Sequence, residues 1–168
     1  MKGWWGHNPS TRFAMPSEHD AIRGAGGYQQ SNPSAILAVT LLGSLQLFDE
    51  AGGIDAIRAK SVKLTAYLES CLRGSKHFVE VGQARTGTAF TIITPREAEA
   101  RGTQLSLFFL GGESVMTAVD VGMKKRGVIG DERKPFVLRL SPVPLYNTYE
   151  DCAKAAWALE EILDGIAS

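Results

Sequence analysis

The stretch FTIITPREAEARGTQLSLFFL, residues 90–110, changes the hydrophobic period of the chain and decides its fold class. Two short runs at residues 90–93 and 104–110 are rich in aromatic and branched side chains. Pro95 and a charged patch at residues 96–101 separate them. Runs of this composition with such boundaries predict β-strands. We therefore expect two strands here, joined by a loop or a short helical turn.

The sequence after these strands predicts a helix and two more strands. Residues 114–126 place apolar side chains at helical spacing, and Gly127 follows as a C-terminal cap. Residues 128–130 and 137–140 are short apolar runs on either side of a charged segment, and we expect both to be strands.

A last helix is expected from Thr148 onward. Thr148 and Asp151 have the spacing of a reciprocal N-terminal cap. The apolar face of this helix consists of Cys152, Ala156, Leu159, Leu163 and Ile166.

Two helices are expected before the first strand. Asn32 suits the N-cap position and Pro33 the first helical position, so the first helix is predicted to run from there to about Glu50. The second has apolar residues at intervals of three and four from residue 54 to residue 72 and ends near Gly74.

Residues 1–31 show neither a strand nor a helix period and are broken repeatedly by proline and glycine. Long loops without regular structure are usually functional or disordered, and a high aromatic content argues against disorder. We therefore expect an irregular arm that packs on a missing part of the same polypeptide or on another subunit. Its large side chains are Trp4, Trp5, His7, Phe13, Met15 and Tyr28.

Together these elements predict an α/β (α+β) fold, in which helices cover one face of a small, mostly antiparallel sheet. The expected organisation is an arm at residues 1–31, two connecting helices at 32–74 and a small α/β domain at 75–168.

Composition excludes several classes of function. The chain has 168 residues, of which 44% are hydrophobic and 21% charged, and its 18 Lys and Arg residues balance 18 Asp and Glu residues. Such a balance gives no field that would gather nucleic acid or an acidic membrane, so we expect neither partner.

The two cysteines, Cys71 and Cys152, lie far apart without a histidine cluster beside them, so we expect neither a metal site nor a disulfide framework. We expect neither a signal peptide, because the first residues contain no apolar segment, nor a membrane span, because no apolar stretch is long enough. These features favour a cytoplasmic protein.

Few side chains stand out as carriers of chemistry, because no standard catalytic motif occurs. Ser31 and Asn32 precede a predicted helix, where they either cap it or help to bind an anion. Arg139 lies in an apolar strand and needs a carboxylate or phosphate partner, which makes it either a structural ion pair or a ligand clamp. His7 lies among aromatic residues, whereas His19 and His77 are expected at the surface.

Six motifs, in the same order along nearly the whole chain, resemble kynureninase. They are GWWGH at residues 3–7, TRFAM at 11–15, GGYQQSNP at 26–33, KSVKLTAYLE at 60–69, RGTQLS at 101–106 and RLSPVPLYN at 139–147. The resemblance covers only the C-terminal part of that enzyme. It departs from the family pattern at Ser34, where the family has a second proline, and at the bulky Phe136 and Val137.

The resemblance implies the small domain of a fold-type-I pyridoxal phosphate enzyme, preceded by an active-site arm. Kynureninases are homodimers that hydrolyse L-kynurenine or 3-hydroxykynurenine to an anthranilate and L-alanine. The family's cofactor-binding lysine lies in a large domain upstream of the GWWGH motif, and no lysine here matches it. The resemblance therefore implies that this chain holds no catalytic residue and is inactive alone.

Individual site residues carry over by position. Trp4 resembles the tryptophan that reaches the cofactor phosphate from the neighbouring subunit, and Asn32 resembles the residue that lines the phosphate and substrate region. Arg139 resembles the arginine that grips the substrate α-carboxylate. Ser31 and His7 resemble further residues that line the substrate site.

Two other hypotheses about the function remain open. The first is a non-catalytic α/β module that binds an amino acid or a partner protein. The second is another fold-type-I enzyme, such as a cysteine desulfurase, which shares the architecture but lacks the Trp-Trp-Gly-His and Pro-Val-Pro-Leu-Tyr-Asn strings. Fold analogy alone does not decide among them.

Overall fold

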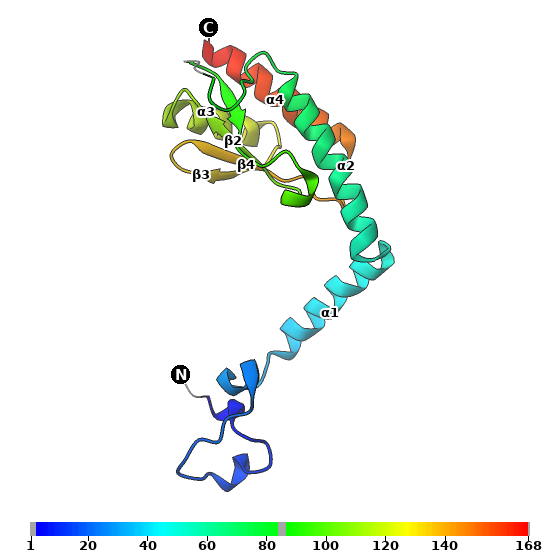
Figure 1. Ribbon diagram of the computed structural model, residues 1–168, viewed down its shortest axis with the longest axis vertical. Helices are drawn as coiled ribbons and strands as arrows, with labels where there is room; N and C mark the ends of the chain where they lie inside the picture. The colour runs from blue at the N-terminus through cyan, green and yellow to red at the C-terminus, as the bar shows by residue number, and fades with distance from the viewer. Residues whose placement is uncertain (1–2, 84–86, 168) are drawn as a thin grey trace. The chain divides into compact units, whose positions relative to one another are not determined.

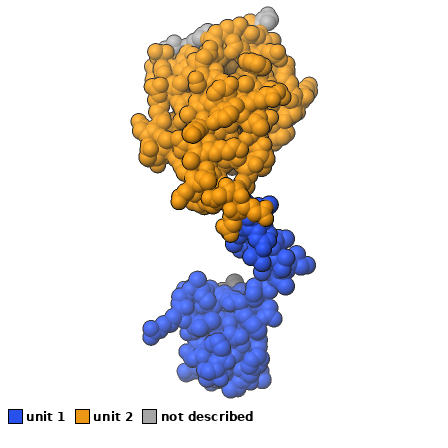
Figure 2. Space-filling model, turned by 90° about the vertical axis from the view of Figure 1, so that its right-hand side faces the viewer, with its two compact units in different colours: residues 1–48 blue, residues 49–168 orange. Residues whose placement is uncertain are grey.

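The structure is a computed structural model that describes residues 3–83 and 87–167. The chain forms two compact units, Met1–Phe48 and Asp49–Ser168 (Figures 1 and 2). We describe each unit by itself.

The second unit contains a four-stranded sheet. Its strands are β1 (Phe90–Ile92), β2 (Leu105–Phe109), β3 (Asp131–Arg133) and β4 (Val137–Leu140). Their order is β1-β2-β4-β3, and each neighbouring pair is antiparallel. The predicted α/β fold with a small antiparallel sheet is confirmed.

Three helices cover one face of this sheet (Figure 1): α2 (Gly53–Arg73), α3 (Glu113–Lys125) and α4 (Tyr149–Ala167). Helix α4 packs against both α2 and α3. Because strand side chains alternate between faces, the leucines at positions 105, 107, 138 and 140 point into this layer. They form one apolar core with helical residues such as Leu64, Leu68, Met116, Val119, Leu159 and Leu163.

The opposite face of the sheet carries the alternate residues, and no helix of the described residues 49–83 and 87–167 packs on it. Ser106, Phe108, Val137 and Arg139 lie on this outer face, and each is half-buried. The predicted candidate Arg139 is therefore directed away from the apolar core.

The last helix begins as its sequence predicts. The Thr148 Oγ1 atom accepts the Asp151 N–H at 3.2 Å, and the Asp151 carboxylate accepts the Thr148 N–H at 2.9 Å. This backbone hydrogen bond from Thr148 holds the pKa of Asp151 below its ordinary value.

The prediction of a strand at residues 128–130 is wrong, because the third strand forms at Asp131–Arg133 instead. Val128 still donates its N–H to the Met123 carbonyl at 3.0 Å and so belongs to the end of α3. The hairpin register pairs Asp131 with Arg139, which sets the strand three residues later than expected.

The helix start expected at Asn32 is also wrong. Helix α1 spans Ala35–Glu50. Ser34 is its N-cap, because its carbonyl accepts the Ala38 N–H at 3.0 Å and its hydroxyl accepts the Leu37 N–H at 3.5 Å. Serine and asparagine are equally good N-caps, so local preference did not choose between the two positions.

The first unit contains short 3₁₀ helices, η1 (Trp4–Gly6), η2 (Arg12–Ala14) and η3 (Gly24–Tyr28), followed by α1. No residue of α1 is buried in the structure as described. The two units divide after Phe48, and α2 contributes its apolar face to the core of the second unit.

We find no single helix among residues 3–83 and 87–167 that is long and apolar enough to cross a membrane. Helices α1 and α2 satisfy that test only when taken together across the break between them.

Candidate functional site

Arg139 on β4 is the candidate side chain of the second unit. Its Nη2 atom forms an ion pair with the Asp131 carboxylate, which also binds Arg133 at 2.9 Å. Its Nε atom is buried and has no hydrogen-bond partner in the part of the chain that the structure describes. The side chain is 27% exposed. Arg139 thus has an internal partner, as the interpretation as a structural ion pair required. It also has an unsatisfied donor, which a ligand clamp can use.

The turn after Arg139 is held firmly. The Asn147 side-chain oxygen accepts the Val143 N–H at 2.8 Å, and the Asn147 backbone N–H donates to the Val143 carbonyl at 2.8 Å. Lys60 on α2 donates to the Pro144 carbonyl. These contacts fix the end of β4, as a ligand-binding arginine requires.

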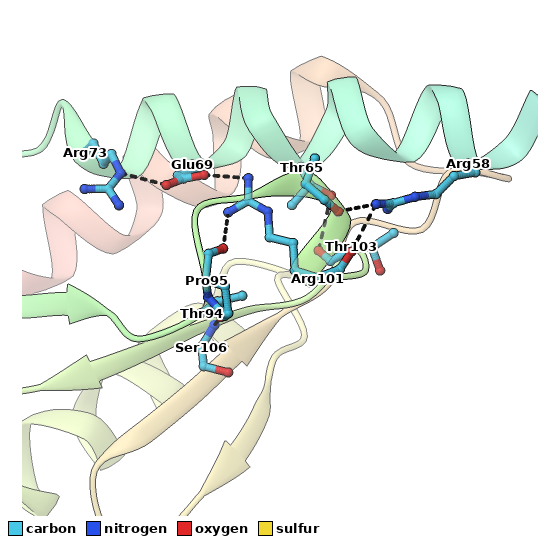
Figure 3. A network of polar contacts seen from close by, with 10 residues as sticks. Arg58, Thr65, Glu69, Arg73, Thr94, Pro95, Arg101, Thr103 and Ser106 are labelled. Atoms are coloured by element: carbon cyan, nitrogen blue, oxygen red, sulfur yellow. Dashed lines mark hydrogen bonds and ion pairs between the residues drawn. The ribbon is translucent and has the colours of Figure 1, made fainter.

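The loop between β1 and β2 is clamped to α2 by a network that the sequence did not predict (Figure 3). The Arg101 guanidinium binds Glu69 at 2.6 Å, and their side chains are only 6% and 10% exposed. Arg73 binds the same carboxylate at 2.8 Å. Burial alone would raise the pKa of Glu69, but the hydrogen bonds from Arg73 and Arg101 outweigh it and lower this pKa. The loop is therefore fixed relative to the helix by a shielded ion pair.

Trp4 is an exposed site residue of the arm, with 48% of its surface accessible. Its ring packs against Trp5 and Phe13, each at a centroid distance of 5.5 Å. Its indole N–H has no hydrogen-bond partner among residues 3–83 and 87–167. This donor is free to meet a ligand oxygen.

Arg12 organises the arm, although sequence reasoning did not single it out. Its buried guanidinium donates to the carbonyls of Trp5 at 2.8 Å and His7 at 3.1 Å, and it lies over the Trp5 ring at 4.3 Å. A second close contact brings Gly6 against the backbone of Gly27, where a side chain would collide. The place of Arg12 directly before Phe13 in the TRFAM motif was the available signal in the sequence.

His7 is only 5% exposed, and both its ring nitrogens are engaged within the arm. Nδ1 accepts the Asp20 N–H at 3.2 Å, and Nε2 lies 3.1 Å from the Thr11 hydroxyl. His7 and Trp4 nevertheless line one hollow of about 320 Å³. The predicted substrate contact of His7 stays a prediction.

Ser31 and Asn32 are exposed, and neither side chain forms a hydrogen bond with a described residue. Because Ser34 is the N-cap of α1, Asn32 lies two residues before the cap rather than at it. These two residues and Trp4 belong to the first unit, whereas Arg139 belongs to the second. Their meeting in one site stays a prediction.

The remaining histidine and cysteine candidates do not add to the site. His77, expected at the surface, is 5% exposed and binds Asp164 at 2.7 Å and Thr88 at 3.2 Å. Cys71 and Cys152 are free, and burial raises the pKa of Cys152 to about 11. A search of residues 3–83 and 87–167 finds no cluster suited to a metal ion.

The second unit is a two-layer α/β domain whose bare sheet face presents an arginine, and an aromatic arm precedes it. A model of the family "Kynureninase C-terminal domain" matches residues 57–159. The chain belongs to the kynureninase family.

Individual relatives agree with this family. The chain is 47% identical over 156 residues to kynureninase of Yarrowia lipolytica, covering 90% of this chain and 36% of the relative. It is 45% identical over 163 residues to kynureninase 1 of Chaetomium globosum, covering 97% and 31%. With kynureninase of Saccharomyces cerevisiae it shares 43% over 169 residues, covering 98% and 37%. The chain spans about a third of the length of these relatives.

Proposed function

We propose that this chain is part of a kynureninase, which hydrolyses L-kynurenine or 3-hydroxykynurenine to anthranilate or 3-hydroxyanthranilate and L-alanine. The observation that carries the proposal is Arg139, a half-buried guanidinium with an unpaired Nε donor on a firmly held strand end. A guanidinium of this kind suits a carboxylate, because its planar fork matches the two carboxylate oxygens. The sequence identity to kynureninases supports this assignment.

The proposed cofactor is pyridoxal 5′-phosphate, which supplies an electron sink for cleavage of the substrate side chain. The free indole N–H of Trp4 and the unbonded amide of Asn32 fit the needs of its phosphate, because both can donate hydrogen bonds. Arg139 would bind the substrate α-carboxylate, and Ser31 and His7 would line the substrate site. The lysine that binds the cofactor would come from polypeptide outside this chain, so the chain alone would be inactive.

We also propose that the first unit packs on the large domain or on the partner subunit of a cytoplasmic homodimer. The support is its apolar surface, since a helix that is hydrophobic on all sides is stable only when buried. On α1 the exposed side chains include Ile36, Leu37, Val39, Leu41, Leu42, Leu45 and Leu47.

Joining this chain to the part of the Yarrowia lipolytica relative outside their match tests the proposal. Supplied with pyridoxal phosphate, the joined protein should hydrolyse L-kynurenine, and this chain alone should not. Arg139→Lys should raise KM for L-kynurenine by roughly tenfold or more, because lysine lacks the two-pronged contact. A folded joined protein without hydrolysis would contradict the proposal. If the chain alone then bound L-kynurenine, the hypothesis of a non-catalytic binding module would replace the proposed enzyme function.

A further inference from the structure

Ser106 lies directly beside Arg139 on the outer face of the sheet. The two residues are partners in the β2–β4 register, and Asp131 is the partner of Arg139 on its other side. Cross-strand partners project from the same face of a sheet. Asp131, Arg139 and Ser106 therefore form one polar row across three strands.

The backbone N–H and carbonyl of Ser106 both form hydrogen bonds on the side of β1. Its carbonyl accepts the Ile93 N–H at 3.0 Å, and its N–H donates to the Thr94 hydroxyl at 2.8 Å. Ser106 and Arg139 are therefore a non-hydrogen-bonded antiparallel pair, the kind in which facing side chains approach most closely. A ligand bound to the Arg139 guanidinium would lie within reach of the Ser106 hydroxyl.

Gln104 sets the direction of that hydroxyl. Its Nε2 atom donates to the Ser106 Oγ atom at 3.4 Å. Ser106 is then an acceptor towards Gln104, which leaves its own proton free to be donated elsewhere. A carboxylate bound to the Arg139 guanidinium would be a good acceptor for this proton, because hydrogen bonds to charged oxygens are stronger than those to neutral ones.

Open space is present next to Ser106 and Gln104, although Arg139 does not itself line it. A hollow of about 350 Å³ is lined by Thr94, Pro95, Arg101, Gln104 and Ser106, among others. Its wall is the loop that the Arg101–Glu69 ion pair clamps to α2, with Arg101 also donating to the Pro95 carbonyl at 3.1 Å (Figure 3). The hollow therefore has a rigid edge on the side of Ser106.

We propose that Ser106 donates a second hydrogen bond to the substrate carboxylate held by Arg139, and that Gln104 is its positioning residue. This inference rests on the function proposed above and assigns two further residues to it. Arg139 shares its Nη2 atom with Asp131, so a second donor from Ser106 compensates for the part of the guanidinium already engaged.

The experiment uses the joined protein described above. Ser106→Ala should raise KM for L-kynurenine roughly tenfold or more, with most of the loss in KM rather than in kcat, because it removes a hydrogen bond to a charged group. Ser106→Thr keeps the hydroxyl and should restore most of that affinity. Gln104→Leu should raise KM by a smaller factor, since it disturbs only the direction of the hydroxyl. Ser70→Ala, an exposed serine on α2, is the matched control.

A decarboxylated analogue of L-kynurenine, measured as a competitive inhibitor, gives a second readout. Its inhibition constant should be the same with Ser106→Ala as with the unsubstituted protein, because it has no carboxylate to lose. An unchanged KM in Ser106→Ala, or an equal loss for both compounds, would overturn the inference while the proposed function stands. If the unsubstituted joined protein has no activity, the proposed function fails and this inference fails with it.

Discussion

The two compact units of this chain differ in whether their apolar side chains are buried. The second unit closes a continuous core beneath its sheet, with residues such as Leu64, Leu107 and Leu138 fully buried. In the described part of the first unit the buried residues are Gly3, Gly6, His7 and Arg12, and the leucines of α1 lie outside. One chain therefore contains a unit with its own apolar core and a segment whose apolar surface is suited to contact with further polypeptide.

A pair of leucine substitutions provides the strongest test of this difference. Leu107→Ala should lower the free energy of unfolding of the full chain by about 2–5 kcal/mol, because it leaves a cavity in the core. Leu41→Ala should change it by about 0.5 kcal/mol or less, since Leu41 is exposed. Urea denaturation followed by circular dichroism measures both. Equal losses would mean that α1 is stabilised by packing inside this chain.

The Glu69 network is the next most sensitive point of the second unit. Glu69→Gln should cost about 3 kcal/mol in the same assay, because it leaves the shielded Arg101 guanidinium without its counter-charge. The exposed pair Lys154 and Glu150 is the control, and Glu150→Gln should cost less than about 0.5 kcal/mol. A negligible loss of unfolding free energy in Glu69→Gln would show that the ion pair between Glu69 and Arg101 does not hold the loop in place.

The same network predicts a pH dependence. The folded-state pKa of Glu69 is lowered, so its stabilising contribution is present above the unfolded value of about 4.3 and is lost as the pH falls through the folded value. Below about pH 4.3 the unsubstituted chain should therefore lose stability more steeply than Glu69→Gln. Parallel acid-unfolding profiles would contradict the lowered pKa.

The expected effect in the first unit is smaller and local. Arg12→Leu removes the hydrogen bonds to the Trp5 and His7 carbonyls and the contact with the Trp5 ring. Tryptophan fluorescence should shift to longer wavelength as Trp5 becomes wetter, while unfolding of the second unit changes by less than about 0.5 kcal/mol. The control is Arg23→Leu, an exposed arginine of the same arm. Identical spectra for the two variants would show that Arg12 does not organise the arm.

The sequence predicted elements whose signals are local. The helix from Tyr149 and the strand Val137–Leu140 lie where periodicity and capping placed them. The strand at Asp131–Arg133 was misplaced because its position depends on hairpin pairing with β4, which no local pattern encodes.

The candidate site was predictable only in part. Arg139 stood out because a charge in an apolar strand needs a partner, but its pairing with Asp131 depends on strand register. The Arg101–Glu69 pair joins a loop to a helix distant in sequence, and His77 is covered by Asp164 from the last helix. Such contacts arise from tertiary packing, so sequence spacing did not reveal them.

Hydrogen exchange of α1 tests the central claim most directly, namely that the first unit is completed by polypeptide outside this chain. Mass spectrometry would follow the amides of residues 35–48 in the chain alone and in the protein joined to the remaining part of the Yarrowia lipolytica relative. We predict at least tenfold slower exchange in the joined protein, because burial of the apolar helix suppresses its local opening. Equal exchange of these amides in both proteins would contradict the claim.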